Sequence, residues 1–170
     1  MPMDPLGKRS RQSADARIRV AAADDASAII ALTNAAFAIE TFMVGPRTDE
    51  ELLAAQMQKG TFLVAQDAAG HILASIYIER QGERGYFGML AVDPAQQGRG
   101  LGRALVRAAE DRCRQQGSKA MDIAVLSLRP ELLPFYYKLG YVETATEEFH
   151  PSRPMKAGVE CHCIIMSKAL

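Results

Sequence analysis

The sequence has little of several things that mark specialised classes of protein. It contains three cysteines, an odd number without the spacing of a disulfide framework. Its 20 basic and 20 acidic residues leave no net charge, so no global field attracts it to nucleic acid or to an anionic membrane. No apolar run approaches the length of a membrane span. With no secretory signal at the N-terminus either, we expect a cytoplasmic protein without a nucleic-acid or membrane partner.

What the sequence does have is the composition of one folded domain. Hydrophobic residues make up 48% of its 170 residues and charged residues 24%, which is typical of a globular domain with a proper core. Residues 1–16 lack apolar periodicity and are predicted to be a mobile N-terminal tail. Residues 17–170 are predicted to form a single domain, and they contain no internal repeat.

The period of the hydrophobic pattern changes several times and predicts a mixed α/β fold. Runs rich in β-branched and alternating residues predict strands at 17–20, 61–66, 71–79, 86–92, 120–126, 141–144 and 158–167. Helical spacing predicts helices at 26–37, from about Thr48 to Gly60, at 101–116 and at 131–139. Asp24 or Asp25 is expected to cap the first helix, and Thr48, three residues before Glu51, the second.

A glycine-rich stretch links the strand 86–92 to the longest helix. The order of strand, turn, Gly98-Arg99-Gly100-Leu101-Gly102 and helix places free backbone N–H groups at the positive end of a helix dipole, which suits a phosphate. A Walker loop is excluded because the Lys-Ser/Thr pair is absent. A dinucleotide fingerprint fits Gly98 and Gly100 with Asp122 as its acidic residue, but Arg103 stands where the third glycine belongs. Dinucleotide binding is therefore the weaker alternative.

Two segments resemble a known family. Leu90-Ala91-Val92-Asp93-Pro94-Ala95-Gln96-Gln97-Gly98-Arg99-Gly100-Leu101-Gly102 resembles the central motif of the GNAT superfamily of acetyl-CoA-dependent N-acetyltransferases. Leu133-Pro134-Phe135-Tyr136-Tyr137-Lys138-Leu139-Gly140-Tyr141 is similar to a second segment of that superfamily, and the likeness covers the chain from about Ile18 to its end. It implies a mixed, mainly antiparallel sheet of about six or seven strands, flanked by about four helices. Two parallel strands should splay apart at the coenzyme site.

The resemblance implies acetyl-CoA as the co-substrate. Glycine at 98, 100 and 102 keeps side chains away from the N–H groups that face a pyrophosphate, while two arginines add positive charge. The strand before the loop should bind the pantetheine arm through its backbone. The coenzyme-binding residues expected on this basis are Leu90, Ala91, Val92, Gln97, Gly98, Arg99, Gly100, Leu101, Gly102, Arg103 and Tyr136.

Tyr136 matches the position that often donates a proton to the departing thiolate in this superfamily. A phenol with a pKa near 10 is protonated at neutral pH and suits that role, whereas Tyr137 points about 100° away on a helix and is expected to pack or face solvent. The strand 86–92 has no carboxylate, so Glu79 is our candidate for the base, with Glu40 and a chain of waters left open. Arg129 stands where the superfamily commonly has asparagine, so a usual coenzyme contact is removed or replaced.

The acceptor is expected to be a primary amine on a small molecule or peptide. It should enter over residues 37–47 and contact Phe37, Glu40 and Phe42. Because no base is evident, a catalytically inert acyl-CoA-binding sensor or regulatory module on the same fold is the alternative function. Cys161-His162-Cys163 alternates along a strand, so these side chains cannot share a zinc site, and no metal is expected. The identity of the amine, the use of other acyl groups and a homodimer all stay open.

Overall fold

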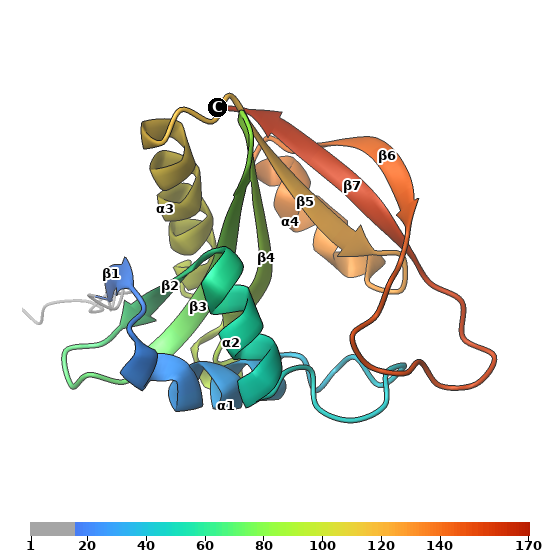
Figure 1. Cartoon of the computed structure of the whole chain (residues 1–170), viewed down its shortest axis with the longest axis horizontal. Coiled ribbons are helices and arrows are strands. Elements are labelled where there is room, and N and C mark those ends of the chain that lie inside the picture. The colour runs from blue at the N-terminus through green and yellow to red at the C-terminus, as the bar shows by residue number, and fades with distance from the viewer. Residues whose placement is uncertain (1–15) are drawn as a thin grey trace, which may run out of the picture.

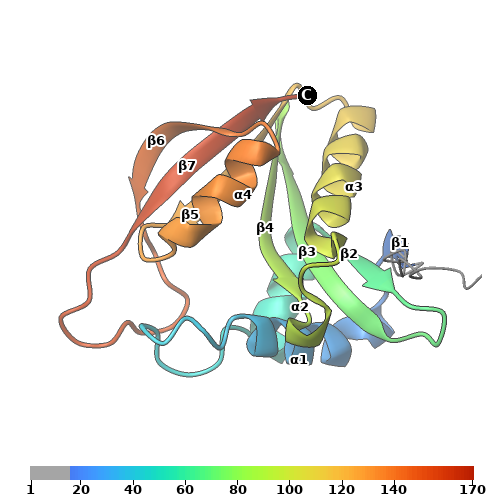
Figure 2. The ribbon, with the colours of Figure 1, turned by 180° about the vertical axis from the view of Figure 1, so that it is seen from behind.

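The computed structural model describes residues 16–170, which form a seven-stranded sheet with helices on both faces (Figures 1 and 2). The strand order is β1-β2-β3-β4-β5-β7-β6, and every neighbouring pair is antiparallel except β4 and β5. The strands are β1 (Arg17–Val20), β2 (Thr61–Gln66), β3 (Ile72–Gln81), β4 (Arg84–Val92), β5 (Ala120–Leu126), β6 (Val142–Glu148) and β7 (His162–Ala169). The α-helices are α1 (Ala26–Ala36), α2 (Glu50–Lys59), α3 (Leu101–Gln115) and α4 (Leu133–Lys138).

The predicted mixed, mainly antiparallel sheet is thus confirmed, with small changes at its ends. The last helix begins as a single 3-10 turn at Pro130–Leu132, and β7 starts at His162, four residues later than expected. Of the predicted N-terminal tail, only Ala16 lies within the described residues, and it packs against the core. No helix in the described part of the chain is long and apolar enough to cross a membrane.

Each face of the sheet has its own hydrophobic core, because successive strand residues point to opposite sides. Phe62 and Val64 face α1 and α2, where they pack with Ile29 and Leu53. Their neighbours in the same strand face α3 and α4 on the other side. That larger cluster includes Leu63, Ala65, Ile76, Phe87, Leu105, Val106 and Tyr136. Figure 1 shows α1 and α2 toward the viewer, and Figure 2 shows α3 and α4 on the reverse.

The parallel strands β4 and β5 pair only where they begin. Their register covers Arg84↔Ala120, Gly85↔Met121 and Tyr86↔Asp122, and beyond these residues the strands diverge (Figure 1). At the closed end, the Asp122 carboxylate accepts hydrogen bonds from Arg84 Nε and Nη2 at 2.6 and 2.7 Å. The splay inferred from the family resemblance is therefore confirmed, and it leaves the edges of both strands free to face a ligand.

The strand β4 also contains a bulge that the residue pattern did not predict. Gly88 pairs with Tyr77 and Ala91 with Ser75, so two residues of β4 stand opposite one of β3. Met89 at this point has φ 51°, a left-handed backbone unusual for a side-chain-bearing residue. The bulge bends the strand just where it separates from β5.

The loop between β6 and β7 packs against the segment between α1 and α2. Met43 and Met155 form an isolated antiparallel bridge. On either side of it, the Val44 N–H donates to the Pro154 carbonyl at 2.8 Å and the Lys156 N–H to the Phe42 carbonyl at 2.9 Å. Segments more than 100 residues apart in sequence are joined here into one wall.

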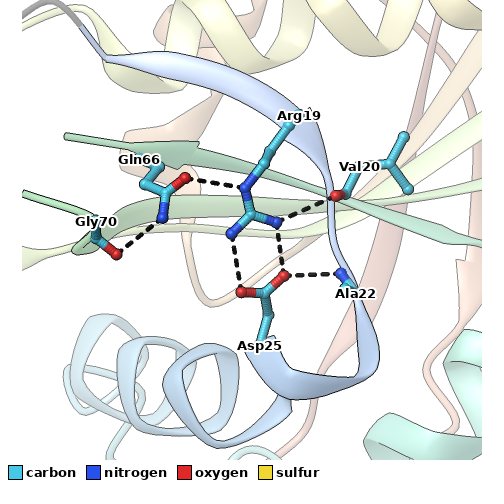
Figure 3. Close-up of polar contacts among 6 residues, drawn as sticks. All are labelled: Arg19, Val20, Ala22, Asp25, Gln66 and Gly70. Carbon is cyan, nitrogen blue, oxygen red and sulfur yellow. Dashed lines mark hydrogen bonds and ion pairs between the residues drawn. The ribbon is translucent and has the colours of Figure 1, made fainter. Parts of the chain in front are cut away.

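The two predicted helix caps differ from those observed. Asp25 directly precedes α1, but its carboxylate accepts hydrogen bonds from Arg19 Nη1 and Nη2 (2.7 and 2.9 Å) and from the Ala22 N–H (2.7 Å) instead of capping the helix (Figure 3). Asp49, not Thr48, caps α2 by accepting from the Leu52 N–H at 2.9 Å. Thr48 is buried, and its backbone N–H and carbonyl are hydrogen-bonded to the Asn34 side-chain amide. This tertiary contact takes the place of a capping role.

Replacing Asp25 with asparagine should therefore destabilise the junction of β1 and α1. The Arg19 guanidinium is the main cause that holds the pKa of Asp25 below its usual range, while burial opposes it. We expect Asp25→Asn to lower the free energy of unfolding by about 1–2 kcal/mol at pH 7, from the loss of charge-assisted hydrogen bonds. Only the ionised Asp25 carboxylate gains from the Arg19 guanidinium. The difference in unfolding free energy between wild type and variant should therefore shrink as pH falls below about 4 and through the lowered pKa of Asp25.

Urea unfolding of both proteins at pH 7, 5 and 3 measures this effect. Asp24→Asn is the matched control, because Asp24 is exposed and makes no side-chain hydrogen bond within residues 16–170. A gap between wild type and Asp25→Asn that stays constant down to pH 3 would contradict the ion-pair explanation.

Candidate active site

A cleft of about 1100 Å³ occupies the opening between β4 and β5. Its walls come from both faces of the sheet, so the opening connects the side of α1 and α2 with the side of α3 and α4. The strands contribute Gly88, Met89, Leu90, Val92 and Ile123–Leu126. The face of α1 and α2 contributes Phe37, Glu40, Arg47, Leu52, Lys59, Tyr77 and Tyr86, and the other face contributes the glycine loop, Arg103, Phe135 and Tyr136.

The glycine loop ends in an uncapped helix terminus. Asp93 fixes the start of the loop, since its carboxylate accepts the Ala95 N–H at 2.9 Å. Gly98 and Gly100 both have φ +81°, a left-handed backbone that favours glycine. Within residues 16–170 no side chain caps α3, and the N–H groups of residues 100–103 have no hydrogen-bond acceptor. Free N–H groups at the positive end of a 15-residue helix form an anion site.

Tyr136 projects from α4 into the cleft with only 8% of its surface exposed. Its ring packs against Phe135, with centroids 5.0 Å apart, and against Phe87 at 6.1 Å. Burial, with a smaller contribution from Tyr86, raises the pKa of Tyr136 to about 12. The hydroxyl stays protonated at neutral pH and has no hydrogen-bond partner among the described residues, so it can donate to a ligand.

A buried ion pair joins the two walls of the cleft. The Glu40 carboxylate is 4% exposed and accepts a hydrogen bond from Arg129 Nη1 at 2.7 Å. Arg129 also donates to Glu131 at 2.5 Å. The arginine that departs from the family pattern is thus held by two carboxylates, one from the α1 side and one from its own turn.

Two tyrosines of the central strands also line the cleft, and neither was among the expected site residues. The Tyr77 hydroxyl donates to the Glu79 carboxylate at 2.8 Å. Burial is the main cause that raises the pKa values of Tyr77 and Tyr86, so both are proton donors at neutral pH. Two features could have indicated that these tyrosines lie together. Alternation along a strand puts Tyr77 and Glu79 on one face, and the antiparallel register sets Tyr86 opposite Glu79.

Comparison with known proteins identifies the family. Residues 19–152 match the family model described as the acetyltransferase (GNAT) domain. The chain belongs to the GNAT family. The GNAT fold therefore accounts for the splayed strands and for the loop before α3, the two features that define the cleft.

Relatives and structural neighbours of this GNAT domain include several acetyltransferases. It is 37% identical over 101 residues to glucosamine 6-phosphate N-acetyltransferase 1 of Oryza sativa subsp. japonica, covering 55% of this chain and 59% of the relative. It is 28% identical over 128 residues to mycothiol acetyltransferase of Clavibacter sepedonicus, covering 74% and 42%. The chain thus spans about half the length of the curated relatives it matches. A GNAT superfamily phosphinothricin acetyltransferase from Sinorhizobium meliloti, in complex with AcCoA, has a similar fold, with a TM-score of 0.73, 18% identity and coverage of 91% and 88%.

Most of the residues expected to bind the coenzyme line the cleft of this GNAT domain. They are Leu90, Val92, Gln97, Gly98, Gly100, Leu101, Gly102, Arg103 and Tyr136. Ala91 is fully buried in the sheet, and Arg99 is exposed outside the lining. The residues expected to bind the amine divide similarly. Phe37 and Glu40 line the cleft, whereas Phe42 lies outside the lining and its carbonyl holds the β6–β7 loop. Glu79 also lies outside and reaches the cleft through Tyr77.

The cysteines do not assemble a metal site in the described part of the GNAT domain. Cys163 lines the cleft, whereas the Cys161 thiol lies 3.7 Å from the Ser127 hydroxyl. No group of three or more histidine, cysteine, aspartate or glutamate side chains in residues 16–170 is placed to hold a metal ion.

Proposed function

We propose that this GNAT domain transfers the acetyl group of acetyl-CoA to a primary amine of a small molecule or peptide, by direct attack of the amine. The observation that carries the proposal is that one cleft holds both an anion-binding helix terminus and a buried, protonated tyrosine. The names of the relatives and the AcCoA complex of a structural neighbour support it. We propose the cytoplasm as the setting, without a nucleic-acid or membrane partner.

The residues present fit coenzyme A. The N–H groups of residues 100–103 lack acceptors within residues 16–170 and can bind a pyrophosphate, and Arg103 beside them adds positive charge. Where β4 leaves β5, the backbone of Leu90 and Val92 can bind the pantetheine amides as an added strand would. The cleft is large enough for such a ligand, since it exceeds the volume of about 300–1,000 Å³ common for ligand pockets.

Acetyl-CoA supplies the thioester. A bond forms between the amine nitrogen and the carbonyl carbon of the acetyl group, and the bond from that carbon to the sulfur of coenzyme A breaks. The departing sulfur needs a proton, and Tyr136 holds one at its hydroxyl. The attacking amine must lose a proton. Glu40, whose Oε1 is buried without a hydrogen-bond partner within residues 16–170, is the carboxylate in the cleft. Glu79, our predicted base, would receive that proton through the Tyr77 hydroxyl.

The second candidate function is an acyl-CoA-binding module without catalysis. One observation favours it. Within residues 16–170, Glu40 is the sole carboxylate that lines the cleft, and it is already paired with Arg129. The one carboxylate of the cleft is thus committed to an ion pair, and no unpaired carboxylate lines the cleft in this part of the chain.

Thermal unfolding with ligands and an assay for released thiol test both functions. We expect acetyl-CoA to raise the melting temperature, NAD to leave it unchanged, and thiol release from acetyl-CoA to require an added primary amine. A thermal shift without amine-dependent release across a broad amine panel would support the binding module. A shift with NAD alone would instead revive dinucleotide binding and overturn the proposal.

A further inference from the structure

We propose that the acceptor amine carries an anionic group, a carboxylate or a phosphate, that Arg47 binds at the end of the cleft beside α1 and α2. This inference rests on the proposed acetyl transfer, and it names the class of amine. Arg47 lies in the segment that joins these helices, and it lines the cleft together with Phe37 and Glu40.

The Arg47 guanidinium is mostly buried, and its hydrogen-bonding capacity is largely unused. Its side chain is 19% exposed, and its Nε is buried with no hydrogen-bond partner within residues 16–170. Nη1 lies 3.0 Å from the Met43 sulfur, a weak acceptor, and 3.9 Å from Glu40 Oε1, too far for a hydrogen bond. A buried guanidinium N–H without a hydrogen-bond acceptor, such as Nε here, is costly, so the site favours an anion that would supply the missing bond.

The guanidinium packs on an aromatic ring. Its central carbon lies over the Phe37 ring, 5.3 Å from the centroid, a contact that restricts the side chain before any ligand arrives. The planar fork of an arginine matches the two oxygens of a carboxylate or a phosphate, which makes a preorganised arginine well suited to either anion.

The charge of the cleft agrees with an anionic ligand. The whole chain is neutral, yet the side chains that line the cleft include the cations Arg47, Lys59, Arg103 and Arg129 and, within the described residues, the single carboxylate of Glu40. Arg129 is neutralised by Glu40 and Glu131. Arg103 belongs to α3, on the face of the sheet opposite to α1 and α2. Arg47, which shares the Glu40 carboxylate only at 3.9 Å, and Lys59 are therefore the least neutralised cations on the α1 and α2 side.

The field of Arg47 reaches the middle of the cleft. Burial raises the pKa values of Tyr86 and Cys163, and the positive charge of Arg47 opposes that rise at both groups. Beside Arg47, the free Oε1 of Glu40 can accept an N–H of the same ligand. An acceptor with an amine and an acid on one short skeleton would satisfy both groups together.

The test compares amines that carry an anionic group with neutral counterparts that lack it. We would measure kcat/KM for thiol release with β-alanine against β-alaninamide, and with O-phosphoethanolamine against ethanolamine, so that the two arms separate carboxylate from phosphate. In at least one arm, the anionic amine should be about tenfold or more better than its neutral partner. Arg47→Gln should erase that preference by lowering kcat/KM for the anionic amine about 10- to 100-fold, mostly through a higher KM. This is the range expected for loss of hydrogen bonds to a charged group. Arg47→Lys should restore part of it.

Two controls separate this inference from the proposed function. Arg114→Gln makes the same chemical change at an exposed residue of α3, and it should behave as wild type. Arg47→Gln should keep the full thermal shift with acetyl-CoA, and loss of that shift would assign Arg47 to the coenzyme and overturn the inference.

Calorimetry on the CoA-saturated protein decides the inference without turnover. The inference is supported if β-alanine or O-phosphoethanolamine binds the wild type and the Arg47→Gln substitution weakens that binding tenfold or more. Equal binding to both proteins, no binding to either, or a preference for the neutral amines overturns it. Anion binding that depends on Arg47, with no thiol release from any amine, would overturn the acetyl transfer alone.

Discussion

Tyr136→Phe is expected to lower kcat by about 10²- to 10³-fold, within the range for loss of a positioned general acid, while the KM for acetyl-CoA changes little. The substitution removes the hydroxyl but keeps the ring that packs against Phe87 and Phe135. The departing sulfur then has no protein donor at this position, whereas the groups that bind the coenzyme remain. Steady-state thiol release, with an amine that the panel shows to be accepted, measures the effect.

Tyr137→Phe is the matched control, one residue further along α4. Tyr137 is 48% exposed and its hydroxyl donates to Glu143 at 2.5 Å, outside the cleft. This variant should keep wild-type turnover. If both variants turn over at the wild-type rate, Tyr136 has no role in the chemistry.

The pH dependence gives an independent check on Tyr136. Because burial raises its pKa to about 12, the phenol keeps its proton throughout the range in which an ordinary tyrosine, with a pKa near 10, would lose it. Turnover of the wild type should show no alkaline loss attributable to Tyr136 below about pH 10. A loss in that range that is absent from Tyr136→Phe would contradict a buried, protonated donor.

Most residues expected on the proposed coenzyme side do line the cleft, because local spacing encodes their arrangement. The glycines of the loop, the strand before it and Tyr136 all belong to two short continuous segments, and the structure places Gly100 and Tyr136 in the same cleft. A loop that joins a strand to a helix has few conformations available, so its residue types largely determine its geometry.

The proposed amine side could not be predicted to the same depth, because it is assembled from distant segments. Glu40 and Arg129 are 89 residues apart in sequence and meet only when α1 packs against the sheet. Arg47 sits in a stretch without helical or strand periodicity, so no pattern indicated where its side chain would point. The bulge at Met89 depends on pairing with β3, which a single strand's composition does not reveal.

Local rules also failed where tertiary contacts competed with them. Thr48 has the spacing of a capping box, but its backbone is bonded to the Asn34 side chain and Asp49 caps the helix. Asp25 precedes α1 as a cap should, yet the Arg19 guanidinium is a stronger partner for its carboxylate than a helix N–H. Both cap predictions were wrong because a competing partner came from another part of the chain.

Gly100→Val is expected to abolish the thermal shift that acetyl-CoA produces. At a concentration of 100 Kd the coenzyme should stabilise the wild type by about 2.7 kcal/mol, or roughly 5–10 °C in a domain of this size. Gly100 has φ +81°, and a β-branched residue there would force the backbone toward negative φ. Since Gly100 immediately precedes α3, this change would turn the free N–H groups of residues 100–103 away from the cleft.

The substitution also carries a general cost, which must be separated from the loss of binding. A β-branched side chain in a left-handed conformation costs about 1–3 kcal/mol wherever it occurs. Gly82→Val provides the comparison, because Gly82 has φ +62° in the turn between β3 and β4, and no heavy atom lies within 4 Å of its added Cβ, as at Gly100. Both variants should melt at lower temperature than wild type without ligand, but Gly82→Val should keep the full shift with acetyl-CoA. A full thermal shift in Gly100→Val would show that binding of the coenzyme does not depend on this loop. The pyrophosphate would then have to bind elsewhere in the cleft.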